Sequence, residues 1–420
     1  MIFRIKVESL FRYSLNLGIR GATIGLKFLF AIFLGKYFSE ETLGEYGLFS
    51  TTILISYLLL SLSFDGYATR EILDKPKERQ LTFIRNELVY FLIAFTVYVV
   101  IGIMFLNRGM IESQLIVYFV ILLLLETITQ ISFSVFTILH KPTDANIVMA
   151  ISQGLWILAI FVIMFINPDA IQDFSEIMVV WIIAGVIAAI FGVGRILTYY
   201  GSMKVERLDW SWIRKGIPVS LLFFCAQLGY KAIEYADRYF IEFKLGTKYV
   251  GLYVFHSQMA NVINAVVNVT VILMLYPRLV ENFNKKDFVA YKAIKRKMMQ
   301  RIVAISAVVG VGGFLFLKAA LAFIGKVSFY ENVSVFYVLL LSNLAMNVSF
   351  VSHYCLYAMR KDFTLVLTTV VGSLLSVVLN FVLIDYYGII GAAIATCASF
   401  IAIAALKFFY VSKYEHALAQ

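Results

Sequence analysis

The chain has 420 residues, of which 61% are hydrophobic and only 15% are charged. Soluble domains carry roughly 25% charged residues, so this composition and a mean hydropathy of +0.86 exclude an ordinary soluble protein and predict a polytopic membrane protein. The net charge of +10 does not indicate a nucleic-acid partner, because the Lys and Arg residues fall between apolar runs, on alternate sides.

About twelve apolar runs follow one another, and each is long enough to cross a hydrocarbon core of about 30 Å. They occupy residues 13–35, 43–64, 86–106, 114–138, 146–166, 176–199, 213–241, 249–275, 302–324, 333–356, 363–384 and 388–411. The polar segment 200–212 separates six runs from six. We therefore expect an all-α fold with an N-terminal six-helix bundle over 1–205 and a C-terminal six-helix bundle over 206–420. All five prolines then fall in connections or at span ends.

The distribution of Lys and Arg predicts the orientation. Most of them lie in loops on one side, with dense clusters in 70–85 and 285–301. The positive-inside rule then places both termini in the cytoplasm. The basic run 285–301 is expected to lie along the anionic lipid surface as a connection between spans. The outside loops are all too short for an extramembrane catalytic domain.

The seventh apolar run carries the most informative charges. Gln227, Lys231, Glu234 and Arg238 recur at offsets of 4, 7 and 11 residues, and a helix presents such offsets on one face. Each charge in hydrocarbon costs roughly 2.5–3.5 kcal/mol, so these side chains are expected to line water, to pair or to hold a ligand. These four residues are called the second polar stripe.

The first apolar run carries a matching face, called the first polar stripe. Asn16, Arg20 and Lys27 precede Gln227, Lys231 and Arg238, each by 211 positions. The following segments also correspond, since Gly44, Tyr46 and Ser50 precede Gly251, Tyr253 and Ser257, each by 207 positions. These correspondences indicate a duplicated chain in which each half opens with a charged span.

Motifs of enzymes and motors are missing from the sequence. It contains no GxxxxGK[ST], GxSxG or HExxH pattern, and its four histidines are far apart. Cys225, Cys355 and Cys397 lie in apolar runs without paired spacing, so they are predicted to be buried small hydrophobes and not disulfides or metal ligands. The sequence therefore predicts a transporter without a cofactor, which works by alternating access, and not an enzyme.

Five segments in a fixed order carry a family resemblance. They are SEETLGEYGLFS at 39–50, SFDGYATREI at 63–72, DRYFIEFKLGTKYVGLYVFHSQMAN at 237–261, LYPRL at 275–279 and LNFVLIDYYGIIGAAIATCAS at 379–399. With them the chain resembles polysaccharide exporters of the multidrug/oligosaccharidyl-lipid/polysaccharide (MOP) flippase superfamily, in particular the Wzx-type O-antigen flippases.

This resemblance implies a MATE-like fold with two pseudo-symmetric bundles around a central cavity. The implied cargo is an undecaprenyl-pyrophosphate-linked oligosaccharide, such as an O-antigen repeat unit of lipopolysaccharide biosynthesis. The protein would move it from the cytoplasmic to the periplasmic leaflet of the bacterial inner membrane. The other expected partners are membrane lipids and the polysaccharide polymerase machinery, and no nucleic acid.

Such a cargo carries a pyrophosphate, for which the chain offers four embedded cations. They are Arg20, Lys27, Lys231 and Arg238. Arg can hold a phosphate by two parallel hydrogen bonds, while Lys acts as a point charge. Arg20 and Lys231 lie deepest on their stripes and are predicted to meet the pyrophosphate. A second interpretation stays open for Lys231, because Glu234 lies three residues away and the two would then only neutralise each other.

Acidic and boundary residues complete the candidate site. Glu234, Asp237 and Glu126 are candidates for binding a coupling H⁺ or Na⁺. A capping role at the end of the span is equally open for Asp237 and Arg238, and an interhelical hydrogen bond is favoured for Glu126. Asp65 and Arg70 are placed at the cytoplasmic end of the second span. A boundary role or a gating role is predicted for them in preference to contact with the cargo.

Two other functions compete with the flippase. The first is an ion-coupled drug or cation antiporter of the same superfamily, which usually needs acidic residues in its cavity. The embedded charge here is mainly basic, which favours an anionic cargo. The second is a membrane-embedded enzyme acting on lipid-linked sugars, and such enzymes generally carry a sizeable outside loop.

Overall fold

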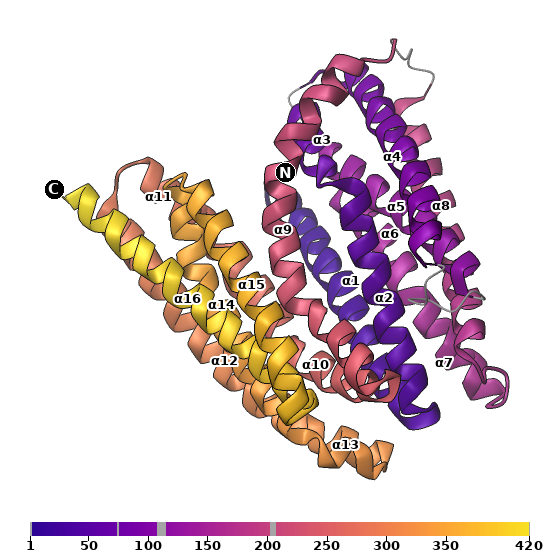
Figure 1. Cartoon of the computed structure of the whole chain (residues 1–420). Coiled ribbons are helices and arrows are strands. Elements are labelled where there is room, and N and C mark those ends of the chain that lie inside the picture. The colour runs from indigo at the N-terminus through magenta and orange to yellow at the C-terminus, as the bar shows by residue number, and fades with distance from the viewer. Residues whose placement is uncertain (1, 74, 107–114, 202–206, 420) are drawn as a thin grey trace. The chain divides into compact units, whose positions relative to one another are not determined.

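The computed structural model describes residues 2–73, 75–106, 115–201 and 207–419, and all regular elements in these ranges are helices (Figure 1). Eleven of the described helical segments are long and apolar enough to cross a membrane, and the bent helix α9 makes a twelfth. They coincide with the twelve apolar runs. The all-α, multi-span fold predicted from the sequence is thereby confirmed.

The residues fall into two compact units by their internal contacts. The N-terminal unit comprises residues 1–30 and 49–224, and the C-terminal unit comprises residues 31–48 and 225–420. Three helices have residues in both: α1 (Ile2–Tyr37), α2 (Glu40–Ser61) and α9 (Trp210–Leu245). The first polar stripe belongs to the N-terminal unit and the second to the C-terminal unit.

The N-terminal unit contains six further α-helices and one π-helical turn. They are α3 (Phe64–Leu73), α4 (Lys77–Leu106), α5 (Ile116–Ile138), α6 (Pro142–Ala150), η2 (Ile151–Leu155), α7 (Trp156–Ile166) and α8 (Phe174–Tyr200). Helix α5 packs against α6 and α8 through a buried cluster that includes Phe136, Ala145 and Val148. The turn η2 interrupts the apolar span that α6 and α7 form together, and such π-turns often occur at functional sites.

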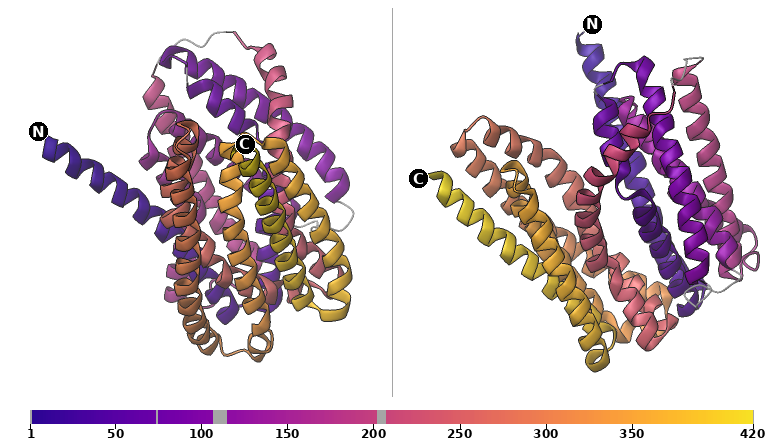
Figure 2. Two further views of the ribbon diagram at one scale, coloured as in Figure 1. Left: turned by 90° about the vertical axis from the view of Figure 1, so that its left-hand side faces the viewer. Right: turned by 45° about the horizontal axis from the view of Figure 1, so that its top comes forward.

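The C-terminal unit consists of the ends of α1, α2 and α9 and eight later elements. They are α10 (Thr247–Val267), η3 (Asn268–Ile272), α11 (Leu273–Asn284), α12 (Phe288–Ile324), α13 (Val327–Glu331), α14 (Val333–Ala358), α15 (Asp362–Tyr387) and α16 (Ile389–Ala419). Helices α14, α15 and α16 lie side by side, with α12 next to α14 (Figure 2). Buried Tyr291, Leu356 and Val411 join α12, α14 and α16 near one end of this layer.

Two glycines explain part of the repeat seen in the sequence. An ideal Cβ on Gly251 would lie 1.9 Å from the carbonyl oxygen of Glu40, and one on Gly44 would lie 2.1 Å from the carbonyl oxygen of Thr247. The start of α2 and the start of α10 therefore touch backbone to backbone, and only glycine permits this approach. The corresponding glycines of the two repeats thus meet inside the C-terminal unit.

The structure corrects two details of the span assignment. Pro218 and Pro277 lie inside α9 and α11 and not at span ends. Helix α9 bends by 42° between Leu221 and Phe223, shortly after Pro218, because proline removes a helical hydrogen bond and crowds the preceding turn. The basic run 285–301 is not a separate connection, since α12 begins at Phe288 and its basic turns continue directly into the span.

The cysteines show that an apolar run does not determine whether a residue is buried inside the protein. Cys355 and Cys397 are buried, but Cys225 is exposed, so its predicted burial was wrong. An apolar run indicates only that a residue avoids water. A residue facing lipid and a residue inside the protein give the same hydropathy signal.

Candidate functional site

The first polar stripe lies along α1 and bonds to α6 and η2. Arg20 Nε donates to Asn146 Oδ1 at 2.7 Å, and Asn146 Nδ2 donates to Asn16 Oδ1 at 2.9 Å. Two turns further along, Lys27 Nζ donates to Gln153 Oε1 at 2.7 Å. The seven-residue spacing of the two cations thus matches the spacing of their two amide partners.

These contacts orient both cations without neutralising them. Amide oxygens carry no formal charge, and no carboxylate of the described residues lies within 4.0 Å of the Arg20 or Lys27 nitrogens. Glu126 interacts electrostatically with Lys27 from beyond that distance. Arg20 is also exposed, and Nε is its only bonded nitrogen among the described contacts. Its two terminal nitrogens therefore remain available to an anion.

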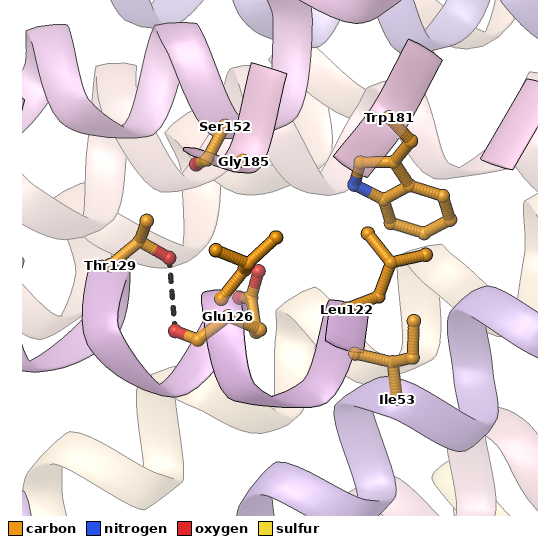
Figure 3. Close-up of a pocket in the computed structure, with 8 residues that line it drawn as sticks. Ile53, Leu122, Glu126, Thr129, Ser152, Trp181 and Gly185 are labelled. Carbon is orange, nitrogen blue, oxygen red and sulfur yellow. Dashed lines mark hydrogen bonds between the residues drawn. The ribbon is translucent and has the colours of Figure 1, made fainter. Parts of the chain in front are cut away.

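Glu126 lines a pocket of the N-terminal unit that measures about 240 Å³ together with its open part (Figure 3). Its Oε1 accepts from Gln130 Nε2 at 2.7 Å, and its main-chain oxygen accepts from Thr129 Oγ1 at 2.9 Å. The hydrogen bond of the carboxylate is therefore within α5, and the predicted interhelical bond is wrong. The i, i+4 spacing explains the difference, because it places Gln130 on the same face one turn away.

The second polar stripe is internally paired. Lys231 Nζ lies 2.9 Å from Glu234 Oε2, with 33% and 31% of the two side chains exposed, and the ammonium also lies 5.0 Å from the ring centre of Tyr235. The structure thus forms the neutralising pair that the sequence left open. The charge of Lys231 is therefore balanced by a carboxylate on its own helix.

Asp237 and Arg238 form a buried network. Asp237 Oδ1 accepts from the backbone N–H of Arg238 at 2.8 Å, and its Oδ2 accepts from Tyr253 Oη and, at 3.3 Å, from Thr396 Oγ1. Arg238 Nη1 donates to the carbonyl oxygen of Gly47 at 3.2 Å. Asp237 is 1% and Arg238 5% exposed, and α9 continues to Leu245. The two residues therefore connect α9 to α2, α10 and α16 within the unit and do not cap the end of a helix.

A polar pocket of the C-terminal unit adjoins this network. It measures about 330 Å³ with its open part and is lined by two carboxylates and by amide and hydroxyl groups: Glu234, Asp237, Tyr253, Ser257, Asn261, Asn264, Ser342, Asn343 and Thr396. Asn264 Nδ2 donates to Asn343 Oδ1 at 2.9 Å, and Asn347 Nδ2 donates to Asn264 Oδ1 at 2.6 Å. Such a lining suits sugar hydroxyls or a cation.

Two groups of residues in the C-terminal unit were missed in the sequence. The asparagines of α10 and α14 are one group, and the i, i+4 spacing of Asn343 and Asn347 in an apolar run was the available signal. Lys407 is the other: it is 0% exposed on α16, its Nζ donates to Tyr230 Oη, and His353 Nδ1 lies 3.4 Å away. Because Lys407 lies near the end of the last apolar run, the sequence could not distinguish it from a solvated residue at the membrane boundary.

Asp65 and Arg70 lie on the short helix α3 and face different neighbours. Asp65 is half-buried, and this burial raises the pKa of its carboxyl group, although the backbone N–H groups of Gly66 and of Asp65 itself oppose the rise. Arg70 is exposed, and its guanidinium lies 4.6 Å from the ring centre of Phe223 on α9. Within the N-terminal unit, Arg70 therefore connects α3 to α9 and does not pair with Asp65.

The helical spans define the class of the protein: a multi-span membrane protein. The chain is similar to an inward-facing multidrug resistance MATE family transporter at 13% identity and a TM-score of 0.76, covering 96% of this chain and 98% of that one. It is similar to the lipid II flippase MurJ in an inward closed conformation at 14% identity and a TM-score of 0.73, covering 95% and 87%. A third similar structure is the Vibrio cholerae MATE transporter VcmN, at 12% identity and a TM-score of 0.62, covering 96% and 98%.

Sequence comparison gives the family. The model described as "Polysaccharide biosynthesis protein" matches residues 13–283, which is more than half of the chain. The chain therefore belongs to the polysaccharide biosynthesis protein family, and the resemblance predicted from its motifs is confirmed. No curated protein matches the chain in sequence.

Proposed function

We propose that the protein is a flippase for an undecaprenyl-pyrophosphate-linked oligosaccharide, the repeat unit of O-antigen or of another surface polysaccharide. It carries the cargo from the cytoplasmic to the periplasmic leaflet of the bacterial inner membrane by alternating access. Membership of the polysaccharide biosynthesis family and the MOP fold support this proposal. The observation that carries it is the pair of cations on α1 that are held by amides and not by carboxylates.

The chemistry of the cargo explains why such cations are needed. A pyrophosphate cannot enter hydrocarbon without compensating charge, because burial of an unpaired ion is very costly. Arg20 offers a guanidinium fork, and Lys27 adds a point charge two turns away. Because Asn146 and Gln153 already fix both side chains, little side-chain freedom is lost when the anion binds.

The C-terminal unit supplies groups for the glycan and for coupling. Its polar pocket presents the Asn264–Asn343 amide network, which matches sugar hydroxyls in kind. Glu234 and Asp237 line the same pocket and are the proposed sites for a coupling H⁺ or Na⁺, with Glu126 as the candidate of the N-terminal unit. Asp65 and Arg70 remain the proposed gating residues.

The proposed topology follows from charge. The basic clusters 70–85 and 285–301 belong on the cytoplasmic side by the positive-inside rule, with both termini there. The polymerase machinery that consumes the flipped lipid is the proposed downstream partner. Consumption of the product on the far side would also favour transport in one direction.

A cation antiporter is the second candidate, and one observation favours it. The pocket of the C-terminal unit contains two carboxylates, and carboxylates attract organic cations. The paired Lys231 reduces this attraction because it balances the charge of Glu234. Arg20 and Lys27 still carry a net positive charge when the negative charge of Glu126 is counted against them, and this favours the anionic cargo.

The deciding experiment is complementation of a strain that lacks its own repeat-unit flippase. Arg20→Gln combined with Lys27→Gln is expected to abolish surface polysaccharide and to leave lipid-linked units facing the cytoplasm. Lys285→Gln is the matched control, because it removes an exposed cation that pairs with Glu281 outside both stripes. Export by the double variant equal to that of the control would contradict the proposal. Gene-dependent resistance to cationic dyes without export would support the antiporter instead.

A further inference from the structure

A buried carboxylate on α4 lies outside the site described above. Glu87 is 0% exposed, and neither of its carboxylate oxygens has a hydrogen-bond partner among the described residues. It is the only described carboxylate with both oxygens buried and unbonded. Asp237, which is buried to a similar extent, has hydrogen bonds to both oxygens. A carboxylate without donors in a membrane span needs a physical explanation.

The charges around Glu87 do not compensate it. The carboxylate of Asp65 on α3 interacts with Glu87 repulsively. Arg85 on the same helix donates a hydrogen bond from Nη2 to Asn86 Oδ1 at 3.3 Å. Among the described residues, no basic group forms a salt bridge with Glu87. The titratable and charged groups in this region are Tyr57 of α2, Asp65 of α3, Arg85 and Tyr90 of α4, Glu126 of α5 and Asp209 before α9.

The surroundings are polar but give Glu87 no bond. Ser63 Oγ and Asn86 Nδ2 are also buried without partners. On the other side, the Tyr90 and Phe64 rings stack with their centres 4.1 Å apart, and Tyr90 Oη donates to the carbonyl oxygen of Ser61 at 3.1 Å. This stack joins α3 to α4.

Burial and like charge favour the same protonation state. An ionised carboxylate that is buried without donors or a counter-ion is strongly destabilised, and a second carboxylate nearby adds repulsion. A neutral carboxylic acid avoids both costs. We propose that Glu87 is a proton-binding site of the N-terminal unit, and that Asp65 is the group with which it exchanges the proton.

The exchange is a simple acid–base step. The O–H bond of Glu87 breaks, its electron pair stays on the carboxylate, and the proton bonds to an oxygen of Asp65 or of a water molecule that reaches it. Asp65 is partly exposed and can pass the proton on. Any movement that separates α3 from α4 would hydrate Glu87 and favour release. The use of this proton to drive transport rests on the proposed function, whereas proton binding itself does not.

The test is infrared spectroscopy of the purified full-length protein in liposomes at neutral pH. The wild type is expected to show the C=O stretch of a protonated carboxylic acid, shifted in D₂O, and Glu87→Gln is expected to lose it. Glu234→Gln is the matched control: it removes a carboxylate that is paired with Lys231, so the band is expected to remain. Absence of the band in the wild type, or an unchanged band in Glu87→Gln, would overturn the proposal. So would a band that appears only when sodium is removed, because Glu87 would then bind a metal cation.

A second measurement, the unfolding temperature, tests whether the Glu87→Gln variant folds normally. Glutamine resembles a neutral carboxylic acid in shape and charge, so Glu87→Gln is expected to unfold at the wild-type temperature at neutral pH. Failure of this variant to fold, or a marked fall in its unfolding temperature, would show that the native group is ionised and would contradict the proposal. Neither readout uses a cargo. Both results would therefore be the same if the protein proved not to be a flippase. In the same way, the flippase proposal would stand if Glu87 proved not to bind a proton.

Discussion

The two segments 16–50 and 227–257 occupy corresponding places in the repeat, but the structure uses them differently. Both place cations at the same helical offsets, and their glycines Gly44 and Gly251 pack against each other's helices. The α1 cations bond to uncharged amides of a neighbouring span, whereas the central cation of α9 pairs with a carboxylate on its own helix. A repeat can therefore preserve which face is polar while the net charge of that face differs.

The largest expected effect comes from the buried charges of the second segment. Asp237→Ala would remove the acceptor of three hydrogen bonds in a buried network. A buried donor that loses its acceptor costs about 1–3 kcal/mol, so the unfolding temperature in detergent should fall sharply. Glu281→Gln is the control, because Glu281 and Lys285 form a pair in which both side chains are exposed, 57% and 67%, and such pairs contribute little to stability because solvent screens them. Equal stability of the two variants would contradict the structure of this network.

The next effect tests the feature that both segments share. Gly251→Ala places a methyl group 1.9 Å from the Glu40 carbonyl oxygen, so α2 and α10 must separate. Overpacking of this kind costs about 1–3 kcal/mol or more. Gly21→Ala on α1 should be neutral or slightly stabilising, because nothing lies within 4 Å of the added atom and alanine favours the helix. Thermal unfolding of both variants measures the difference, and a stable Gly251→Ala protein would refute the close approach.

A double-mutant cycle on Lys231 and Glu234 sharpens the comparison. Each side chain is about one-third exposed, so solvent screening limits the pair to roughly 0.2–1 kcal/mol of stability. In transport, Lys231→Met and Glu234→Gln should each reduce export, and their combination should restore most of it because the net charge is again zero. A double variant as poor as the worse single variant would show that Lys231 contacts the cargo directly.

The smallest effect concerns pH. Burial raises the pKa of Asp65 in the folded protein, while an unfolded Asp titrates near about 3.9. The folded state then binds this proton more tightly than the unfolded state does, and the difference stabilises the fold. This stabilisation is complete below about pH 3.9 and is lost as the pH rises through the folded pKa. Asp65→Asn should remove that loss and give a slightly higher unfolding temperature at neutral pH. A lower unfolding temperature across this range would contradict the burial of Asp65.

The sequence predicted the spans well because hydropathy and helix length are local properties. The twelve runs, the polar faces of α1 and α9 and the Lys231–Glu234 pair all follow from spacing along one helix. The partners of Arg20 and Lys27 do not, because Asn146 and Gln153 lie 126 residues away. The burial of Glu87 and Lys407 was not predicted either. Each lies near the boundary of an apolar run, where hydropathy cannot distinguish a solvated charge from a buried one.

The most direct test of the account is the affinity of the purified protein in nanodiscs for undecaprenyl pyrophosphate. If the α1 cations hold the diphosphate, Arg20→Gln with Lys27→Gln should weaken binding roughly tenfold to a hundredfold, the value of one charge-assisted hydrogen bond. Lys231→Met with Glu234→Gln should bind almost as well as the wild type. Equal affinity of the wild type and the α1 double variant, or a greater loss in the α9 double variant, would contradict the account.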